Sequence, residues 1–360
     1  MIEFRGVTKR YPDGTVAVDN LELQVRDGGI TVFVGPSGCG KTTSLRMVNR
    51  MIDPSSGTIL VNGTDVMKTD AAQLRRGIGY VIQQAGLFPH RTIVDNVATV
   101  PLLLGWSKKK ARDHAMELME TVGLTPEMAQ RYPGQLSGGQ QQRVGVARAL
   151  AADPPVLLMD EPFSAVDPVV RESLQDELLK LQAELGKTIV FVTHDIDEAV
   201  KLGDRVAVFR VGGKLAQYDE PGVLLARPAD DFVDSFVGRD RGYRGLSFRS
   251  SERLPLHDLR TARSGERTEE GWTLVLDAEG RPLGWHLDRH GGAMADAGDL
   301  VPGGSLYDAG TGSLRSALDA ALSSPSGQGV AVDGDGRAVG SVAADDVLDA
   351  LAAARRAEAA

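Results

Sequence analysis

Short apolar runs alternate with amphipathic segments along the first part of the chain. A hairpin is predicted over residues 2–11 and 16–25, and the apolar run at 30–34 leads through a glycine-rich loop into a helix that begins near Lys41. A continuous apolar run of this length is typical of a strand that is buried on both faces. The opening therefore predicts a strand, a loop and a helix in that order.

The same alternation returns in the middle of the chain. Strands are predicted at 156–160 and 188–192, and they are followed by helices at 169–185 and 195–202. Strands that alternate with helices favour a parallel sheet with crossover helices, so the predicted fold class is α/β.

A helical subdomain is predicted between these two regions. A strand near 78–82 precedes a stretch of helical periodicity at 92–122, which ends at Gly123. Because glycine commonly follows the last turn of a helix, the position of Gly123 agrees with this reading. We expect the helical subdomain to occupy about residues 85–150.

The texture of the sequence changes after Gly238. Lysine is absent after Lys214, and we expect a linker at 239–253. Beyond it, TLVLDAEGRPLGW at 273–285 and GVAVDGDGRAVGS at 329–341 each contain an apolar strand, an acidic glycine turn and a second strand. Apolar periodicity at 314–322 and 345–353 predicts helices on both sides of the second copy. An α-β-β-α unit is therefore expected there.

Composition and charge narrow the class of protein. The length of 360 residues favours two or three domains. No apolar run approaches the roughly 20 residues that span a bilayer, and the first residues lack a signal-peptide pattern. Cys39 is the only cysteine, so an internal disulfide is impossible, and the net charge of -9 argues against a nucleic-acid partner. We expect a protein of the cytoplasm.

The segment GPSGCGKT at 35–42 has the spacing of a phosphate-binding loop. Its place between a strand and a helix lets the loop amides and the helix N-terminus converge on phosphate groups. Lys41 can place a positive charge beside the β and γ phosphates, and Thr42 can offer its hydroxyl to Mg²⁺. The candidate nucleotide-binding residues here are Gly35, Pro36, Ser37, Gly38, Cys39, Gly40, Lys41, Thr42 and Thr43.

Three polar residues follow predicted strands. Asp160 and Glu161 end the run LLMDEP, and His194 follows TIVFVT. Open α/β sheets place their ligands at the carboxyl ends of strands. Adjacent acidic residues at a strand end are ordinarily only solvated, and the phosphate-binding loop is what favours a chemical role here. Carboxylates in such a place can reach the hydration shell of Mg²⁺ or polarise a water molecule.

The segment LSGGQQQR at 136–143 is a glycine-rich turn that opens a helix. Such a turn can supply backbone N–H groups and a serine hydroxyl to an anion. Together with the loop at 35–42, it resembles the nucleotide-binding domain of the ABC family, in which ATP lies between the loop of one copy and the LSGGQ turn of another. The resemblance implies ATP and Mg²⁺ as cofactors and a homodimer. The turn residues are Ser137, Gly138, Gly139 and Gln140.

The ABC resemblance also implies roles for single residues. His194 would contact the γ-phosphate and help Glu161 to position the attacking water. Gln83, which ends the strand GYVIQ, would sense Mg²⁺ and this water, and Gln84 competes with it for the role. Tyr11 would lie under the adenine, although simple packing also accounts for it, and Asp167 in SAVD would contact the second subunit. These assignments give Glu161, His194 and Gln83 as catalytic residues and Thr42, Gln83 and Asp160 as metal ligands.

Longer segments resemble a particular branch of ABC importers. These segments are GGITVFVGPSGCGKTTSLRMVNRMIDPSSGTI, YPGQLSGGQQQRVGVARAL and LLMDEPFSAVDPVVR, and they are similar to the ATP-binding subunits that serve quaternary-amine osmoprotectants such as glycine betaine, carnitine and choline. The resemblance implies two copies at the cytoplasmic face of the membrane, two permease subunits and an external binding protein. Because those partners would recognise the solute, another small polar solute stays open, as does a soluble ABC ATPase that acts on nucleic acid or ribosomes.

The C-terminal region resembles a degenerate tandem pair of CBS domains at 254–354. In the importer family this α+β region is regulatory and responds to ionic strength or to an adenine nucleotide. CBS nucleotide sites commonly carry Thr or Ser where Leu287 and Ala343 stand here, although Asp288 and Asp346 remain. These departures argue against nucleotide sensing, and a purely structural tail is the alternative.

Overall fold

The computed structural model describes residues 2–83, 86–164, 166–295 and 297–359. The chain divides into two compact units, Met1–Gly238 and Arg239–Ala360. Buried apolar clusters lie within each unit, so each has a hydrophobic core of its own.

A six-stranded sheet forms the centre of the first unit. Its strand order is β10-β9-β3-β8-β7-β6, and every pair is parallel except β9 with β10. The strands are β3 (Ile30–Val34), β6 (Ile78–Val81), β7 (Val156–Asp160), β8 (Thr188–Val192), β9 (Arg205–Arg210) and β10 (Lys214–Asp219). The predicted α/β core is confirmed.

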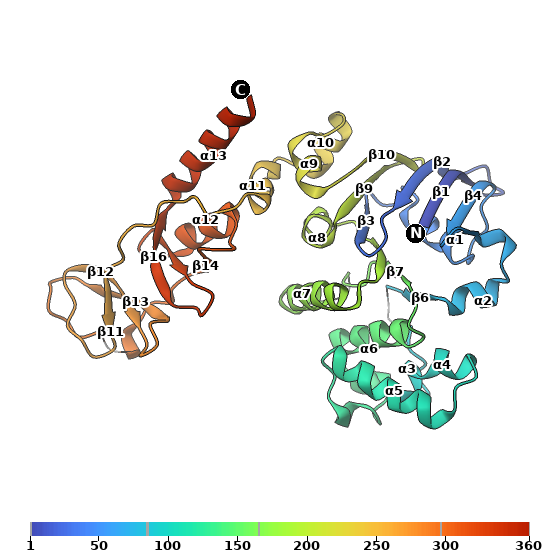
Figure 1. The fold of residues 1–360 in the computed structure, drawn as a ribbon, viewed down its shortest axis with the longest axis horizontal. Helices are drawn as coiled ribbons and strands as arrows, with labels where there is room; N and C mark the ends of the chain where they lie inside the picture. Colours follow the sequence, from blue (N-terminus) through green and yellow to red (C-terminus); the bar gives the residue numbers. More distant parts are fainter. Residues whose placement is uncertain (1, 84–85, 165, 296, 360) are drawn as a thin grey trace. The chain divides into compact units, whose positions relative to one another are not determined.

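Side chains of the sheet alternate between two apolar clusters. Ile30, Val32 and Val34 of β3 belong to one cluster, whereas Phe33 belongs to the other. Both faces of the sheet are therefore covered, which explains why its strands are apolar throughout. Figure 1 shows helices α7 and α8 on one side of the sheet and α1 on the other. The helices of this layer are α1 (Lys41–Val48), α7 (Pro168–Leu185), α8 (Ile196–Leu202), α9 (Pro221–Ala226) and α10 (Asp231–Val237).

The first unit also contains a smaller antiparallel sheet, in the order β2-β1-β4-β5. The pairing of β1 with β2 confirms the predicted hairpin. Its elements are β1 (Ile2–Arg10), β2 (Val16–Val25), β4 (Ser56–Val61) and β5 (Thr64–Asp65), and helix α2 (Ala71–Arg76) follows them.

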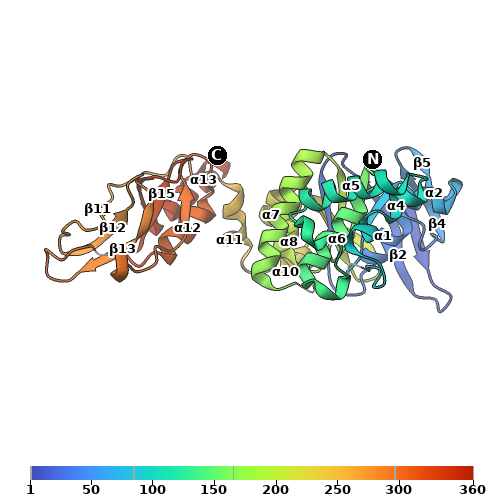
Figure 2. The same cartoon turned by 90° about the horizontal axis from the view of Figure 1, so that it is seen from below.

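The helical subdomain consists of α3 (Ile93–Val97), α4 (Thr99–Leu103), α5 (Lys108–Thr121) and α6 (Gly138–Leu150). It has a separate apolar core, and Figure 1 shows its helices as a group beside the sheet, whereas Figure 2 shows α4, α5 and α6 in front of it. The stretch predicted as helical at 92–122 is broken rather than continuous. Gly105 takes a left-handed backbone angle of φ 85°, and the Ser107 side chain then caps α5 by accepting from the Lys110 backbone N–H.

The second unit contains two three-stranded sheets of the same topology. In each sheet the middle strand pairs with a parallel strand on one side and an antiparallel strand on the other. The sheets are β11 (Thr261–Arg263), β12 (Gly271–Leu276) and β13 (Pro282–Asp288), and β14 (Leu306–Asp308), β15 (Gln328–Val332) and β16 (Ala338–Ala343). Within the described residues, α-helices accompany only the second sheet, namely α12 (Leu314–Ser323) and α13 (Ala344–Ala359). The predicted α-β-β-α unit is confirmed.

The two repeated hairpins exchange equivalent hydrogen bonds. The Nε of Arg281 donates to the carbonyl oxygen of Asp335 at 3.1 Å, and the Nε of Arg337 donates to that of Glu279 at 3.2 Å. Arg281 and Arg337 occupy the same place in the two copies of the sequence repeat, as do Glu279 and Asp335. The repeat is therefore a pair of hairpins that bind each other in a two-fold manner.

The linker predicted at 239–253 requires a correction. This segment contains α11 (Arg241–Gly245) and a short 3₁₀ turn, Leu246–Phe248. Leu246 is buried in the core of the second unit together with Leu254 and Tyr307. A single buried leucine among arginines and glycines gives no periodicity, so the sequence pattern does not reveal that this segment packs.

Candidate functional site

The glycine-rich loop lies between the end of β3 and the start of α1. A Cβ atom on Gly40, where φ is 92°, would lie 2.1 Å from the Ala17 carbonyl oxygen, and one on Gly35 would lie 2.3 Å from that of Phe209. Both positions therefore require glycine for close packing. Gly38 instead has open space around it, so the backbone there is accessible.

Lys41 begins α1 and points back under the loop. Its ammonium group is buried and donates to the carbonyl oxygens of Gly35 at 2.7 Å and Pro36 at 3.0 Å. Gly40, the N-cap of α1, has no side chain that could satisfy the first amides of the helix. A buried ammonium group together with uncapped amides suits an anion, so the loop fits a polyphosphate.

Asp160 and Thr42 form the part of the site that fits a metal. The Thr42 hydroxyl donates to Oδ1 of Asp160 at 2.8 Å, and Asp160 is only 5% exposed at the end of β7. Among the described residues no group of three or more His, Cys, Asp or Glu side chains could hold a metal. One hydroxyl and one carboxylate fit Mg²⁺, which commonly takes its remaining ligands from phosphates and water.

Two further side chains hold Asp160 on its other oxygen, and the sequence patterns did not indicate them. The Tyr80 hydroxyl lies 3.4 Å from Oδ2, and Nη2 of Arg46 lies 3.6 Å from the same atom. Burial, and after it the negative charge of Asp160, raises the pKa of Tyr80, so its hydroxyl stays protonated and can donate. Nothing in the position of a tyrosine within an apolar strand shows which side chain its hydroxyl will meet.

Glu161 brings the three predicted catalytic residues together. Its Oε2 lies 3.2 Å from Nδ1 of His194 and 3.5 Å from Nε2 of Gln83. The Glu161 backbone adopts φ 47°, and its N–H donates to the Val192 carbonyl oxygen at 3.0 Å. This left-handed turn directly after β7 is costly for a residue with a side chain, and strain of this kind clusters at functional sites. Gln84, the competing candidate for the role of Gln83, lies outside the described residues.

Tyr11 lies at the end of β1 and is half-buried. Its backbone closes a turn with Thr15 and Gly14, and the Lys9 ammonium lies 5.3 Å from the centre of its ring. Stacking of this ring under adenine stays a prediction.

The LSGGQ turn opens helix α6 with a capping box. The Ser137 hydroxyl accepts from the Gln140 N–H at 3.3 Å, and the Gln140 side chain accepts from the Ser137 N–H at 3.0 Å. A Cβ on Gly139 would lie 3.0 Å from a methyl group of Val170, so glycine here permits close packing of α6 on α7. Gly138 has open space. Figure 1 shows α6 with the helical subdomain, whereas α1 lies against the sheet.

Asp167 caps the N-terminus of α7 by accepting from the Val169 N–H at 3.0 Å. The preceding carbonyl oxygen, that of Val166, accepts from Nη2 of Arg171 at 3.1 Å. Residue 165 of the same loop lies outside the described residues. The loop that carries Asp167 is therefore fixed to the first turns of α7.

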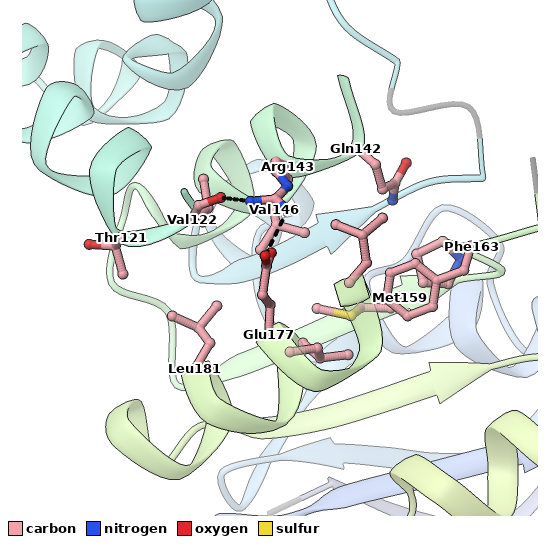
Figure 3. Close-up of a pocket in the computed structure, with 12 residues that line it drawn as sticks. Thr121, Val122, Gln142, Arg143, Val146, Met159, Phe163, Glu177 and Leu181 are labelled. Carbon is pink, nitrogen blue, oxygen red and sulfur yellow. Dashed lines mark hydrogen bonds and ion pairs between the residues drawn. The ribbon is translucent and has the colours of Figure 1, made fainter. Parts of the chain in front are cut away.

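A small apolar cavity of about 40 Å³ lies between the end of α5, α6 and α7, and Met159 and Pro162, on either side of Asp160 and Glu161 in the chain, also line it. Figure 3 shows Arg143 bridging the Val122 carbonyl oxygen, at 3.0 Å, and the Glu177 carboxylate, at 2.7 Å, on its edge. Nε2 of Gln142 is buried there without a hydrogen-bond partner among the described residues. The space suits a water molecule rather than a nucleotide.

The strand, phosphate loop and helix, the acidic end of β7 and the separate glycine turn on α6 define the ATP-binding cassette of ABC transporters. A family model described as ABC transporter matches residues 18–164. The chain is 36% identical to an ATP-binding cassette, MJ0796, solved as a dimer in a post-hydrolysis state with ADP and Pi. That match covers 61% of this chain and 99% of the other, with a TM-score of 0.56.

Curated relatives narrow the class. The osmoprotectant import ATP-binding protein OsmV of Salmonella typhimurium is 45% identical over 99% of this chain and 97% of its own length. The glycine betaine/carnitine/choline transport ATP-binding protein OpuCA of Bacillus subtilis is 52% identical over 67% of this chain and 63% of its own length. The chain belongs to the osmoprotectant importer family of ABC transporter ATP-binding subunits, and it is an ATPase of that family.

No helix among the described residues is long and apolar enough to cross a membrane.

Proposed function

We propose that two copies of this chain close around Mg²⁺ and ATP and drive the import of a quaternary-amine osmoprotectant through partner permeases. The observation that carries the proposal is the convergence of His194 and Gln83 on one oxygen of Glu161, next to the Asp160 and Thr42 pair. In this proposal Glu161 is a base beside the pair that binds the metal, at the carboxyl edge of the sheet, and hydrolysis of a phosphate anhydride uses such an arrangement.

Each residue of the site has a distinct task in this proposal. Lys41 and the backbone N–H groups of 37–43 would hold the phosphates, and Thr42, Asp160 and Gln83 would hold Mg²⁺, which would supply neutralising charge at the reacting phosphates. Glu161 accepts a proton from the attacking water, and His194 orients Glu161 and contacts the γ-phosphate. Tyr11 supports the adenine.

The second copy would complete the site. Ser137, Gly139 and Gln140 of the partner subunit offer a hydroxyl and helix N-terminal amides to the γ-phosphate, a role that open space at Gly138 permits. Asp167 of the partner subunit lies in the contact loop. The dimeric cassette structure similar to this chain supports this arrangement.

The solute and the partners follow from the relatives. Relatives named for osmoprotectant, glycine betaine, carnitine and choline transport support a quaternary-amine cargo. Two permease subunits and a binding protein would recognise this cargo, and the ATPase would act at the cytoplasmic face of the membrane as a peripheral subunit.

For the C-terminal unit we propose a degenerate CBS-like tandem with a regulatory or dimer-stabilising task that does not use a nucleotide. The Asp288 carboxylate accepts hydrogen bonds from backbone N–H groups of its own loop. The Asp346 carboxylate accepts from the Ala343 N–H at 2.8 Å and lies 2.8 Å from Nε2 of His257. Both carboxylates that remain from the CBS pattern therefore have internal partners.

Uptake of labelled glycine betaine tests the main proposal. Cells that carry the native permease and the intact chain should accumulate the label faster at high osmolarity, and Glu161→Gln should abolish this uptake because the base is lost. As the control, the amounts of the permease and of the ATPase chain in the membrane fraction should be equal in cells with the intact chain and in cells with Glu161→Gln. Uptake that survives Glu161→Gln would show that this chain does not energise glycine betaine import.

A further inference from the structure

A buried polar bridge joins the loop that carries His194 to the helix that follows Asp167. Glu198 lies on α8 and Gln175 on α7, and each is only 7% exposed. Oε1 of Glu198 accepts from Nε2 of Gln175 at 3.2 Å, and Oε2 accepts from the Thr193 hydroxyl at 2.6 Å. The carboxylate therefore links two separate segments of the chain.

On one side, the bridge fixes the backbone around His194. The Thr193 hydroxyl also accepts from the Asp195 N–H at 3.0 Å, and the Thr193 N–H donates to the Phe33 carbonyl oxygen at 3.1 Å. Both neighbours of His194 are thus held in the network that ends on Glu198. The imidazole itself is exposed and contacts only the Glu161 carboxylate at 3.2 Å among the interactions described, so its place depends on this backbone.

On the other side, the bridge reaches the Asp167 loop through a rigid helix. Gln175 lies about two turns along α7 from Asp167, a distance of roughly 12 Å. The first turns of α7 hold that loop, because Arg171 donates from Nη2 to the Val166 carbonyl oxygen and from its backbone N–H to that of Asp167 at 2.8 Å. A displacement of residues 166–167 therefore moves Gln175.

Packing alone does not explain the bridge, because burial of the Glu198 carboxylate is unfavourable. Burial raises the pKa of Glu198, while the hydrogen bond from Thr193 opposes this shift; the charge of Asp195 adds to it, and Gln175 and Arg171 oppose it. Buried carboxylates seldom add stability over an apolar side chain of the same size. A geometric task accounts better for a carboxylate that touches both segments.

We propose that Glu198 and Gln175 are positioning residues that transmit movement of the Asp167 loop to His194. This inference rests on the proposed function, in which Asp167 contacts the second copy and His194 orients Glu161. Engagement of the partner at one end of α7 then adjusts the catalytic geometry at the other end of the bridge.

ATP hydrolysis by variants of the full-length chain tests the proposal. Gln175→Ala and Glu198→Ala should lower kcat about 10-fold while KM for ATP changes less than about 2-fold, because mispositioned catalytic groups lose rate rather than binding. Glu198→Gln should recover most of the rate, since an amide can still bridge Thr193 and a rotated Gln175 amide. The double variant Asp167→Ala with Gln175→Ala should hydrolyse ATP no more slowly than the slower of the two single variants.

Gln182→Ala is the matched control. It removes the same side chain from the same helix, but Gln182 donates to the carbonyl oxygens of Gly28 and Lys187 rather than to the His194 loop. Gln175→Ala that is as active as Gln182→Ala, with unchanged melting temperature, would overturn the proposal. Independent losses for Asp167→Ala and Gln175→Ala would overturn it as well.

The same assay separates this inference from the proposed site. If Glu161→Gln and His194→Ala abolish hydrolysis while the bridge variants stay active, only the bridge is wrong. If Glu161→Gln hydrolyses ATP at the normal rate, the proposed catalytic base is wrong. Gln175→Ala decides the matter even where Glu198→Ala fails to fold.

Discussion

The hydrogen-bond partners around each carboxylate in this protein determine what that carboxylate can do. Asp160 has a hydroxyl on one oxygen and Tyr80 with Arg46 on the other, whereas Asp288 is surrounded by backbone N–H groups. The proximity of Thr42 and Asp160 agrees with the sequence analysis, which assigned both to Mg²⁺: Thr42 lies in the helix after β3, and Asp160 ends the parallel strand β7. The tasks of Tyr80 and Arg46 cannot be anticipated from sequence, because they depend on which rotamers the packed core allows.

Asp288 gives the protein an acid-sensitive point in its second unit. Hydrogen bonds from the backbone of His290 and Ala293, and further from Gly291 and Thr268, lower the pKa of Asp288 from 3.8 to about 2. A depressed pKa means that the contribution to stability is complete above the unfolded value and is lost as the pH falls toward the folded value. The carboxylate therefore stabilises the loop above about pH 4 and ceases to do so near pH 2.

Denaturant unfolding of the full chain, followed by tryptophan fluorescence, measures this contribution. Asp288→Asn should destabilise the second unit by a constant amount above about pH 4, and the difference from the unaltered chain should shrink toward pH 2. Trp272 and Trp285 report on the second unit, and Trp285 is buried three residues before Asp288, whereas Trp106 reports on the first unit. A difference that grows as the pH falls contradicts the assignment.

The helices and strands of this protein differ in how well the sequence predicts them. The apolar runs at 156–160 and 188–192 match β7 and β8 residue for residue, because strands buried on both faces contain few other residues. The stretch 92–122 is harder to predict, since the break at Gly105 interrupts an otherwise continuous periodicity. The packing of residues 241–248 depends on the tertiary contact of Leu246 and leaves no local pattern.

The exchange between the two hairpins of the second unit should contribute measurably to its stability. Arg281→Ala and Arg337→Ala each remove one side-chain hydrogen bond to a carbonyl oxygen of the other hairpin, so each should lower the free energy of unfolding by about 0.5 kcal/mol. Arg289→Ala, an exposed arginine of the same unit, is the control. Denaturant midpoints that fall equally for Arg289→Ala and Arg281→Ala would show that only the loss of charge matters.

At the scale of the whole molecule, the two units have separate cores and separate sheets. The motifs at 35–42, 136–143 and 156–161 could be predicted because phosphate chemistry restricts their residue types. The second unit has weaker signals, because its first repeat lacks the α-helices of its second within the described residues. The match to OsmV covers nearly the whole chain and therefore includes both units.

If the second unit is regulatory rather than dimer-stabilising, a chain truncated after Gly238 should hydrolyse ATP with kcat and KM within about 2-fold of the full chain, because all clusters of the first core lie before this residue. With the native permease, its uptake should no longer respond to osmolarity if the second unit is regulatory. The measurements are ATP hydrolysis by the truncated and the full chain, and osmoprotectant uptake by each of them together with the native permease. An unchanged osmotic response would leave the second unit with a structural task alone.

The convergence of Gln83 and His194 on Glu161 has a consequence for sequence divergence. Gln83, Glu161 and His194 follow β6, β7 and β8, which are adjacent strands of one sheet. Neighbouring strands lie about 4.8 Å apart because of backbone hydrogen bonds, whatever their side chains are. The spacing of these three residues is thus set by hydrogen bonds of the main chain, so the sequences of helices and loops can diverge far while the three side chains keep their spacing.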